Sequence, residues 1–231
     1  MGNVSESDTA APRAVLFDID GTLVDSNYLH VETWTRAFFD VGHPVDAWRV
    51  HRSIGMDGDR LLAQLLPSQS DDVRERAKEL HLRYHLDAAD RMRVLPGARE
   101  LLADLAGRGI AVVLASSASE DEIAVLRRVL DVDDLIAAAT SSASVETAKP
   151  EPDIVAVALS QVNVAAENAV LVGDAVYDMG AATRAGVTAI GVLSGGIGAD
   201  ELVATGAAAV FDDAADLLAH LDESPIRKLV Q

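Results

Sequence analysis

One short segment, Ala14-Val15-Leu16-Phe17-Asp18-Ile19-Asp20-Gly21-Thr22, carries the clearest structural signal in the chain. Its first four residues are apolar without alternation, which is typical of a strand buried on both faces of a parallel sheet. The run stops at two acids, Asp18 and Asp20, separated by one residue. In open parallel sheets, ligands bind beyond the carboxyl ends of the strands. The segment therefore predicts a buried strand that presents two carboxylates at a ligand-binding edge.

Further apolar runs of the same kind follow, and helical patterns separate them. The runs span residues 110–115, 135–139, 169–172, 187–192 and 208–211, and the helical segments span 96–106, 120–130, 152–161 and 177–185. An alternation of buried strands with helices is typical of a doubly wound parallel sheet, so the sequence predicts a Rossmann-like α/β fold.

Residues 26–93 break this alternation. Four helical patterns occupy 29–41, 45–54, 59–66 and 71–90, with turn residues between them and no strand pattern. We therefore expect an all-helical insert directly after the first strand. The α/β core would consist of residues 1–25 and 94–231, with 1–10 forming a loose tail.

Composition excludes several classes of function. The chain has 231 residues, with 37 acidic and 19 basic side chains and a net charge of −18. This charge argues against binding to nucleic-acid polymers and to anionic membranes. The absence of cysteine excludes disulfides, thiol catalysis and thiolate zinc sites. No membrane-spanning run or signal peptide is visible, so we expect a cytoplasmic protein, and no obligate protein partner is inferred.

The paired acids suggest a metal site. Asp18 and Asp20 repel each other unless a cation holds both ionised, and carboxylate and carbonyl oxygens suit Mg²⁺. The alternative is an ordinary turn, because Asp, Gly and Thr are turn formers. A second pair, Asp174 and Asp178, follows the apolar run 169–172. Helix capping by Asp174 is the alternative there.

Two further residues could contact a phosphate at the same sheet edge. Ser116 follows the run 110–115 and offers a hydroxyl beside backbone N–H groups, although a plain helix N-cap would explain it equally. Lys149, one of only three lysines, precedes a helical segment; a lone lysine in a loop is more often simply solvated.

Together these motifs resemble those of the haloacid dehalogenase superfamily. Asp18-x-Asp20-Gly21-Thr22, Ser116, Lys149-Pro150 and Gly173-Asp174-x-x-x-Asp178 occur in the family's order across nearly the whole chain. The helical insert resembles the family's small cap. Within the superfamily, the chain is similar to phosphoglycolate phosphatase-like and β-phosphoglucomutase-like members.

The resemblance implies hydrolysis of a small phosphomonoester through an aspartyl-phosphate. It implies that Asp18 attacks phosphorus and that Asp20 acts as general acid and base. Mg²⁺ would be held by Asp18, the Asp20 backbone carbonyl and Asp174, with Asp178 as a supporting acid. The residues expected to contact phosphate are Thr22, Ser116, Ser117 and Lys149. Four acids carry a charge of about −4, and Mg²⁺ with Lys149 returns about +3, so the metal is needed before an anionic substrate can enter.

Two other functions stay open. A β-phosphoglucomutase-like mutase must rebind a second phosphate, but the segment 54–60 of this chain has glycine where the mutase pattern has arginine, and no lysine follows Ser116. Arg60 or Arg52 could substitute, so hydrolysis is favoured without excluding the mutase. A non-catalytic phosphoacceptor or regulatory module is the other alternative. It would most simply lose Asp18 or Asp20, and both are present.

Substrate specificity is expected from the insert. The candidate residues are His30, Gly55, Gly58 and Arg60, with His51 and Arg52 as further possibilities. Two glycines in the segment 55–60 make a flexible loop that can reach the site on closure. Trp34, with Phe38 four residues later, fits packing better than ligand binding. The single lysine of the insert, Lys78, fits a solvated helix face. The sequence does not name the phosphorylated metabolite.

Overall fold

The computed structural model describes residues 11–142 and 149–230; the tail predicted for residues 1–10 lies outside this range. Its centre is a parallel six-stranded sheet with the order β5-β4-β1-β6-β7-β8. The strands are β1 (Ala14–Phe17), β4 (Ala111–Ala115), β5 (Ile136–Thr140), β6 (Ala169–Gly173), β7 (Thr188–Val192) and β8 (Ala207–Phe211). Strand order reverses around β1, which lies between β4 and β6. The predicted doubly wound α/β fold is therefore confirmed.

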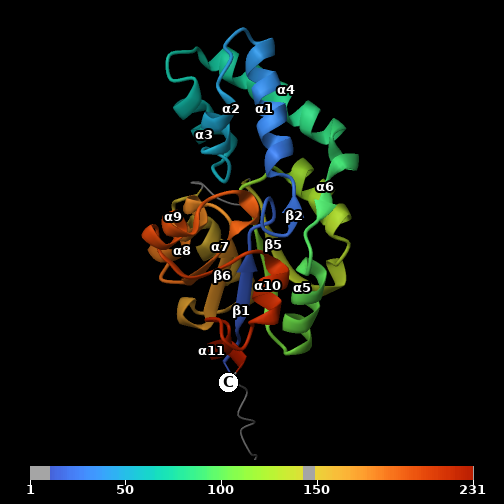
Figure 1. The fold of residues 1–231 in the computed structure, drawn as a ribbon, viewed down its shortest axis with the longest axis vertical. Coiled ribbons are helices and arrows are strands. Elements are labelled where there is room, and N and C mark those ends of the chain that lie inside the picture. The colour runs from blue at the N-terminus through green and yellow to red at the C-terminus, as the bar shows by residue number, and fades with distance from the viewer. Residues whose placement is uncertain (1–10, 143–148, 231) are drawn as a thin grey trace, which may run out of the picture.

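Helices cover both faces of the sheet (Figure 1). One face carries α5 (Ala98–Gly107), α6 (Glu120–Leu130), α10 (Ala214–Ala219) and α11 (Arg227–Val230), and the other carries α7 (Asp153–Val162), α8 (Val176–Arg184) and α9 (Ala199–Ala204). Side chains of β1 alternate between the two cores: Val15 and Phe17 enter the first, Ala14 and Leu16 the second. Both faces of β1 are buried, which explains its unbroken apolar sequence.

The helical insert follows β1 and stands over the carboxyl end of the sheet (Figure 1). It contains α1 (Asn27–Asp40), α2 (Ala47–His51), α3 (Gly58–Leu65), α4 (Asp71–Asp87) and the short 3₁₀ helix η1 (Ala89–Arg91). Two connections join it to the core, β2 (Val24–Asp25) and β3 (Arg93–Val94), which pair antiparallel. Arg93, the last residue of the predicted all-helical insert, is thus the first residue of a strand.

The insert has a small apolar core of its own. Trp34 and Phe38 are buried there, with ring centroids 5.4 Å apart, together with leucines of α3. Trp34 therefore packs as the sequence predicted, although it also lines the cavity described below.

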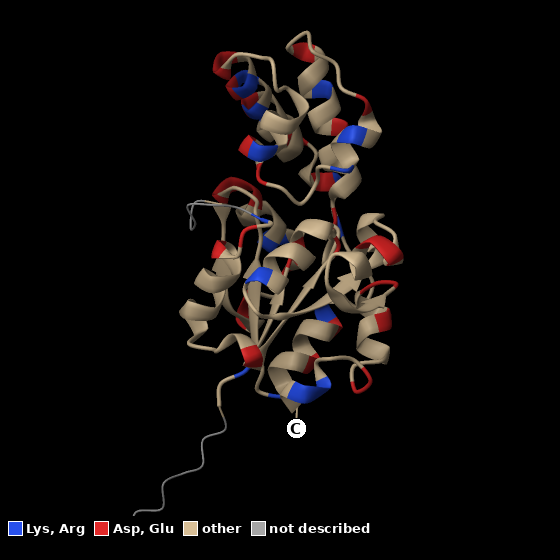
Figure 2. Cartoon of the chain, turned by 90° about the vertical axis from the view of Figure 1, so that its left-hand side faces the viewer, with Lys and Arg blue, Asp and Glu red and all other residues tan. Residues whose placement is uncertain are grey.

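Charge is distributed over the whole surface. Acidic and basic side chains are scattered over both the core and the insert (Figure 2). Among the described residues, no helix is both long and apolar enough to cross a membrane.

Candidate active site

A cavity of about 520 Å³ lies between the carboxyl ends of the core strands and the insert. The core contributes Asp18 and Asp20 after β1, and Ser116 and Ser117 after β4. The insert contributes residues of α1, α3 and α4 and the segment before α3. Of the predicted site residues, the cavity is lined by Asp18, Asp20, His30, Gly55, Gly58, Arg60, Ser116 and Ser117. The topology therefore brings together side chains that are up to 99 residues apart in sequence (Asp18 to Ser117).

A buried lysine compensates the acid at the end of β1. The Nζ atom of Lys149 lies 2.6 Å from Asp18 Oδ1 and 2.7 Å from Asp178 Oδ1, and Lys149 is fully buried. Burial opposes the charged lysine, but the two carboxylates outweigh this effect and raise its pKa above the ordinary value. Lys149 is therefore a permanent cation, and Asp178 helps to fix its position.

The surroundings of Asp18 disfavour its charged form. Burial, together with the charges of Asp178 and Asp20, raises the pKa of Asp18 to about 7, against the opposing effect of Lys149. One lysine is therefore not enough to keep this carboxylate fully ionised at neutral pH. A further cation beside Asp18 would restore its charge and its nucleophilicity.

Asp174 makes the site still more anionic. Asn27 Nδ2 donates to Asp174 Oδ2 at 2.7 Å, and the Thr22 hydroxyl donates to Oδ1 at 3.2 Å. Burial and the neighbouring charges of Asp18 and Asp178 raise the pKa of Asp174 well above its ordinary value.

The three acids Asp18, Asp174 and Asp178 form a buried triad. Their nearest carboxylate oxygens all lie within 4.8 Å of one another. Such a set of hard oxygen donors, with an uncompensated negative charge, fits a divalent cation such as Mg²⁺.

Glycines keep the space around Asp174 open. A Cβ atom at Gly195 would lie 1.6 Å from Asp174 Oδ2. At Gly21, where φ is +74°, it would lie 2.6 Å from the same oxygen. Any other residue at these two positions would displace the carboxylate, so both glycines are needed for the triad's geometry.

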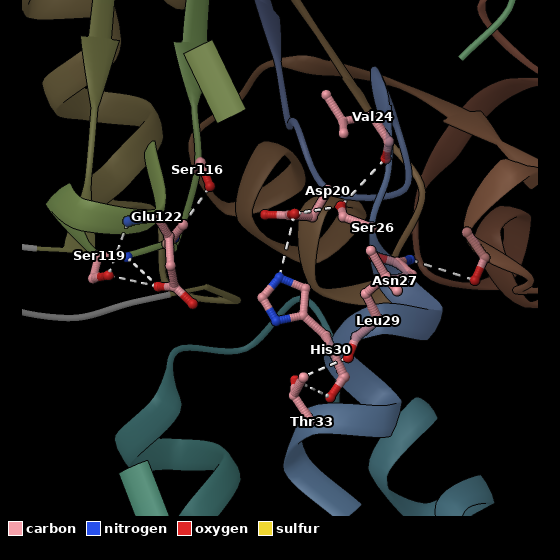
Figure 3. A network of polar contacts seen from close by, with 12 residues as sticks. Asp20, Val24, Ser26, Asn27, Leu29, His30, Thr33, Ser116, Ser119 and Glu122 are labelled. Atoms are coloured by element: carbon pink, nitrogen blue, oxygen red, sulfur yellow. Dashed lines mark hydrogen bonds and ion pairs between the residues drawn. The ribbon is translucent and has the colours of Figure 1, made fainter. Parts of the chain in front are cut away.

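Asp20 is bound by the insert rather than by the core (Figure 3). The Ser26 hydroxyl donates to Asp20 Oδ1, and His30 Nε2 lies 3.3 Å from the same oxygen. Burial alone would raise the pKa of Asp20, but His30 outweighs burial and lowers it. The pKa of His30 is raised in turn: burial opposes its charge, and Asp20 outweighs burial. Asp20 and His30 therefore form an ion pair in which His30 holds the proton, and both residues line the cavity.

The serines after β4 take different roles. Ser116 is buried at the strand end, where its Oγ accepts from the backbone N–H of Ala118 at 3.1 Å. The hydroxyl of Ser117 has no hydrogen-bond partner among the described residues. Ser119, not Ser116, is the N-cap of α6 and forms a capping box with Glu122. Ser116 and Ser117 are thus left at the cavity wall, where an anion could accept from them.

The segment of the insert around residues 55–60 lines the cavity on the side opposite the sheet. Gly55, Gly58 and Arg60 line the cavity, and Asp57 caps α3 by accepting from the backbone N–H groups of residues 59 and 60. The Arg60 guanidinium donates to the Lys149 carbonyl at 3.3 Å and contacts Glu151. Lys78 lies at the rim with 41% of its side chain exposed, paired with Asp59.

Six predicted residues do not line the cavity: Lys149, Asp174 and Asp178, which lie behind Asp18, and Thr22, His51 and Arg52. Thr22 donates its hydroxyl to Asp174, as described above. His51 Nε2 lies 3.0 Å from the Gly195 carbonyl, and Arg52 pairs with Glu201 on α9. The last two residues therefore bridge the insert to the core.

Sequence reasoning missed several buried polar residues around the site. They are Ser26 and Asn27 at the start of α1, His81 and His85 on α4, and Glu122 on α6. The only signal was the spacing of the two histidines, which places them on one face of a helix. Their partners on α1 and α6 are distant in sequence.

Comparison with known proteins identifies the family. The sequence matches the haloacid dehalogenase-like hydrolases over residues 15–192, so the chain belongs to this family. A phosphoglycolate phosphatase of Rhodospirillum rubrum is 32% identical over 217 residues, which is 89% of each chain. A β-phosphoglucomutase of Bacillus subtilis is 28% identical, over 83% of this chain and 88% of the relative.

Solved structures agree with this assignment. A hydrolase from Pseudomonas syringae superposes with a TM-score of 0.88 at 35% identity, covering 91% of this chain and 98% of the other. The predicted superfamily, its phosphoglycolate phosphatase and β-phosphoglucomutase branch, and the helical insert are therefore confirmed. The chain is a hydrolase of this family.

Proposed function

We propose that the protein is a Mg²⁺-dependent phosphatase that hydrolyses a small phosphorylated metabolite through an aspartyl-phosphate on Asp18. One observation carries the proposal: Asp18 opens into the cavity while a buried lysine and two further buried carboxylates surround it. This set suits attack of a carboxylate on an electrophilic phosphorus. Relatives named as phosphatases for phosphoglycolate and for phosphorylated carbohydrates support the substrate class.

In this proposal the metal is held by Asp18, the backbone carbonyl of Asp20 and Asp174. When bound, Mg²⁺ supplies positive charge to the phosphoryl oxygens and to Asp18. Lys149 supplies a second positive charge, and Asp178 keeps it in place. Thr22 and Asn27 orient Asp174.

The remaining residues bind phosphate and move protons. The hydroxyls and nearby N–H groups of Ser116 and Ser117 contact phosphoryl oxygens. Asp20, recharged from His30, protonates the leaving alkoxide and later takes a proton from the attacking water. Because the two residues are already paired, the proton has a short path to the cavity.

A phosphosugar mutase is the second candidate. Arg60 and Lys78 line the cavity and supply positive charge on the insert side, where a second phosphate would bind. Arg60, however, already contacts the Lys149 carbonyl and Glu151. We therefore propose hydrolysis as the principal activity.

Phosphate release from p-nitrophenyl phosphate tests the proposal. We expect turnover that needs Mg²⁺ and that falls by about 1,000-fold or more in Asp18→Asn. The matched control is Asp25→Asn, which changes an exposed acid near the insert connection and should leave turnover intact. Equal activity of Asp18→Asn and wild type would refute the role of Asp18. A panel of phosphomonoesters, with β-glucose 1-phosphate and a bisphosphate primer included, then separates hydrolase from mutase.

A further inference from the structure

Beside the aspartate triad, another group of side chains of metal-ligating types lies buried between the insert and the core. It consists of His30 on α1, His81 on α4 and Glu122 on α6. Each of the three residues is buried, with at most 9% of its surface exposed. All three line the wall of the cavity. The cluster shares no residue with the triad, and its donor atoms are of a different chemical kind.

The outer contacts of the cluster fix which atoms face inward. His30 Nε2 faces the Asp20 carboxylate, which can only accept, so this nitrogen carries the hydrogen. The Thr33 hydroxyl donates to the Leu29 carbonyl at 2.8 Å, so it accepts from His81 Nδ1 at 3.0 Å.

Glu122 is held from outside in the same way. Its Oε2 accepts from the backbone N–H and the hydroxyl of Ser119, at 2.8 and 2.6 Å (Figure 3). Each of the three side chains therefore has one polar atom engaged outside the cluster and one left over.

The atoms left over face one another: His81 Nε2 and Glu122 Oε1 carry lone pairs, and His30 Nδ1 becomes an electron-pair donor when a metal ion displaces the proton that it carries in the ion pair with Asp20. The two nitrogens are 3.4 Å apart, and His81 Nε2 is 3.6 Å from Glu122 Oε1. A proton on His30 Nδ1 would be donated to the neutral His81 Nε2, and hydrogen bonds from N–H donors usually span about 2.7–3.2 Å. The observed separations are longer. They are close to the edge of about 3.3 Å that a tetrahedron has when its ligands lie about 2.0–2.1 Å from Zn²⁺.

We propose that His30, His81 and Glu122 form a binding site for a divalent transition-metal ion of the Zn²⁺ type. Two imidazoles and one carboxylate suit such an ion better than Mg²⁺. The outer contacts with Asp20, Thr33 and Ser119 are of the kind that orient metal-ligating histidines and carboxylates. Ring stacking adds to this order, because His81 lies flat against Trp34 at 3.9 Å and His30 against His85 at 3.8 Å.

Because the site lies between the insert and the core, a bound ion would affect how the two parts are held together. Two of its ligands come from the insert and one from the core, so a bound ion ties the two parts together over the cavity. The same ion would hold the His30 ring in the orientation that contacts Asp20. This inference does not depend on the proposed phosphatase activity, because the site is defined by its own geometry.

Zn²⁺ titration of the chelator-treated protein, in saturating Mg²⁺ to fill the aspartate triad, tests the proposal. We expect one Zn²⁺ per chain by calorimetry and metal analysis. Thr33→Val, which removes only an outer contact, should weaken the affinity by about 10–100-fold. Loss of a ligand, in His81→Gln or Glu122→Gln, should weaken it by more. Gln at position 122 still accepts from Ser119, so the capping box of α6 is kept. His220→Gln, at an exposed histidine outside the cluster, is the matched control and should bind as wild type.

Co²⁺ gives a readout that needs no variant. Nitrogen ligation in a four-coordinate site produces intense visible bands, whereas an all-oxygen octahedral site stays pale, so the spectrum separates the cluster from the triad. The proposal is overturned by any of three results: no Zn²⁺ uptake in the presence of Mg²⁺, equal uptake by wild type and the two ligand variants, or a pale octahedral Co²⁺ spectrum. If no Zn²⁺ is taken up, or if the Co²⁺ spectrum is that of an octahedral site, a proton shared within the cluster would explain its geometry instead.

Discussion

His85 should make the protein sensitive to acid in a way that one substitution can isolate. This residue lies on α4 and is fully buried, with its ring stacked on His30. Neither of its ring nitrogens has a hydrogen-bond partner among the described residues. Burial, helped by the positive charge of His30, lowers the pKa of His85 to about 3. We expect His85→Leu, which keeps the bulk and removes the titration, to change the pH dependence of stability.

The direction of the stability change follows from the pKa of His85 in the folded protein and in the unfolded chain. The folded protein keeps His85 neutral down to about pH 3, whereas the unfolded chain protonates it near pH 6.5. Acid therefore favours the unfolded chain, and stability falls as the pH drops through this window. At about 1.4 kcal/mol per pH unit, the 1.5 units between pH 6.5 and pH 5 cost about 2 kcal/mol. The variant avoids this cost, while His30 and His81 titrate in both proteins and largely cancel in the difference.

Urea unfolding in the presence of chelator, at pH 7 and pH 5, measures the effect. His85→Leu should be more stable than wild type at pH 7, because two unsatisfied buried nitrogens are removed. Its advantage should grow by about 2 kcal/mol at pH 5. His220→Leu provides a control of opposite sign, because contacts with Asp216 raise the pKa of that exposed histidine. An advantage of His85→Leu that stays the same at both pH values would refute the reasoning.

Two further substitutions test the core site. Lys149→Met should lower the free energy of unfolding in chelator by about 3–5 kcal/mol, because it leaves buried carboxylates without their cation; unchanged urea denaturation would contradict this. Gly195→Ala should raise the Mg²⁺ concentration needed for half-maximal turnover, because its Cβ would displace the Asp174 carboxylate. Gly107→Ala, a helical position with open space around it, is the matched control, and equal Mg²⁺ dependence of the two variants would exclude the steric argument.

The strands of the main sheet could be predicted from sequence because each is an unbroken apolar run that packs on both faces. The run predicted at 110–115, for example, is β4 at Ala111–Ala115. The helix predicted at 120–130 has the observed bounds, since the Ser119–Glu122 capping box defines its start. By contrast, β2 and β3 have two residues each, and α9 and α10 have six. Segments this short show no periodicity, and long-range packing determines them.

The candidate site divides along the same line. Asp18, Ser116 and Asp174 could be found because the carboxyl ends of neighbouring parallel strands meet at one edge. The distribution of charge among the acids could not be predicted from the sequence. The sequence suggested that Lys149 offsets Asp18, whereas in the structure its Nζ lies equally close to Asp178. Asn27, His81 and His85 were not predicted because their partners lie on elements whose relative packing the sequence does not encode locally.

The contacts of Asp20 show how the insert enters the chemistry. Both of its side-chain partners, Ser26 and His30, lie just beyond β2, where the chain passes from the core into α1. His30 in turn lies against His81 and His85 on α4, so its position depends on the packing of two insert helices. Since His30 is what lowers the pKa of Asp20 against the effect of burial, the insert sets the protonation of this core carboxylate. Any displacement of α1 relative to β1 therefore changes the acid–base properties of the site as well as its access.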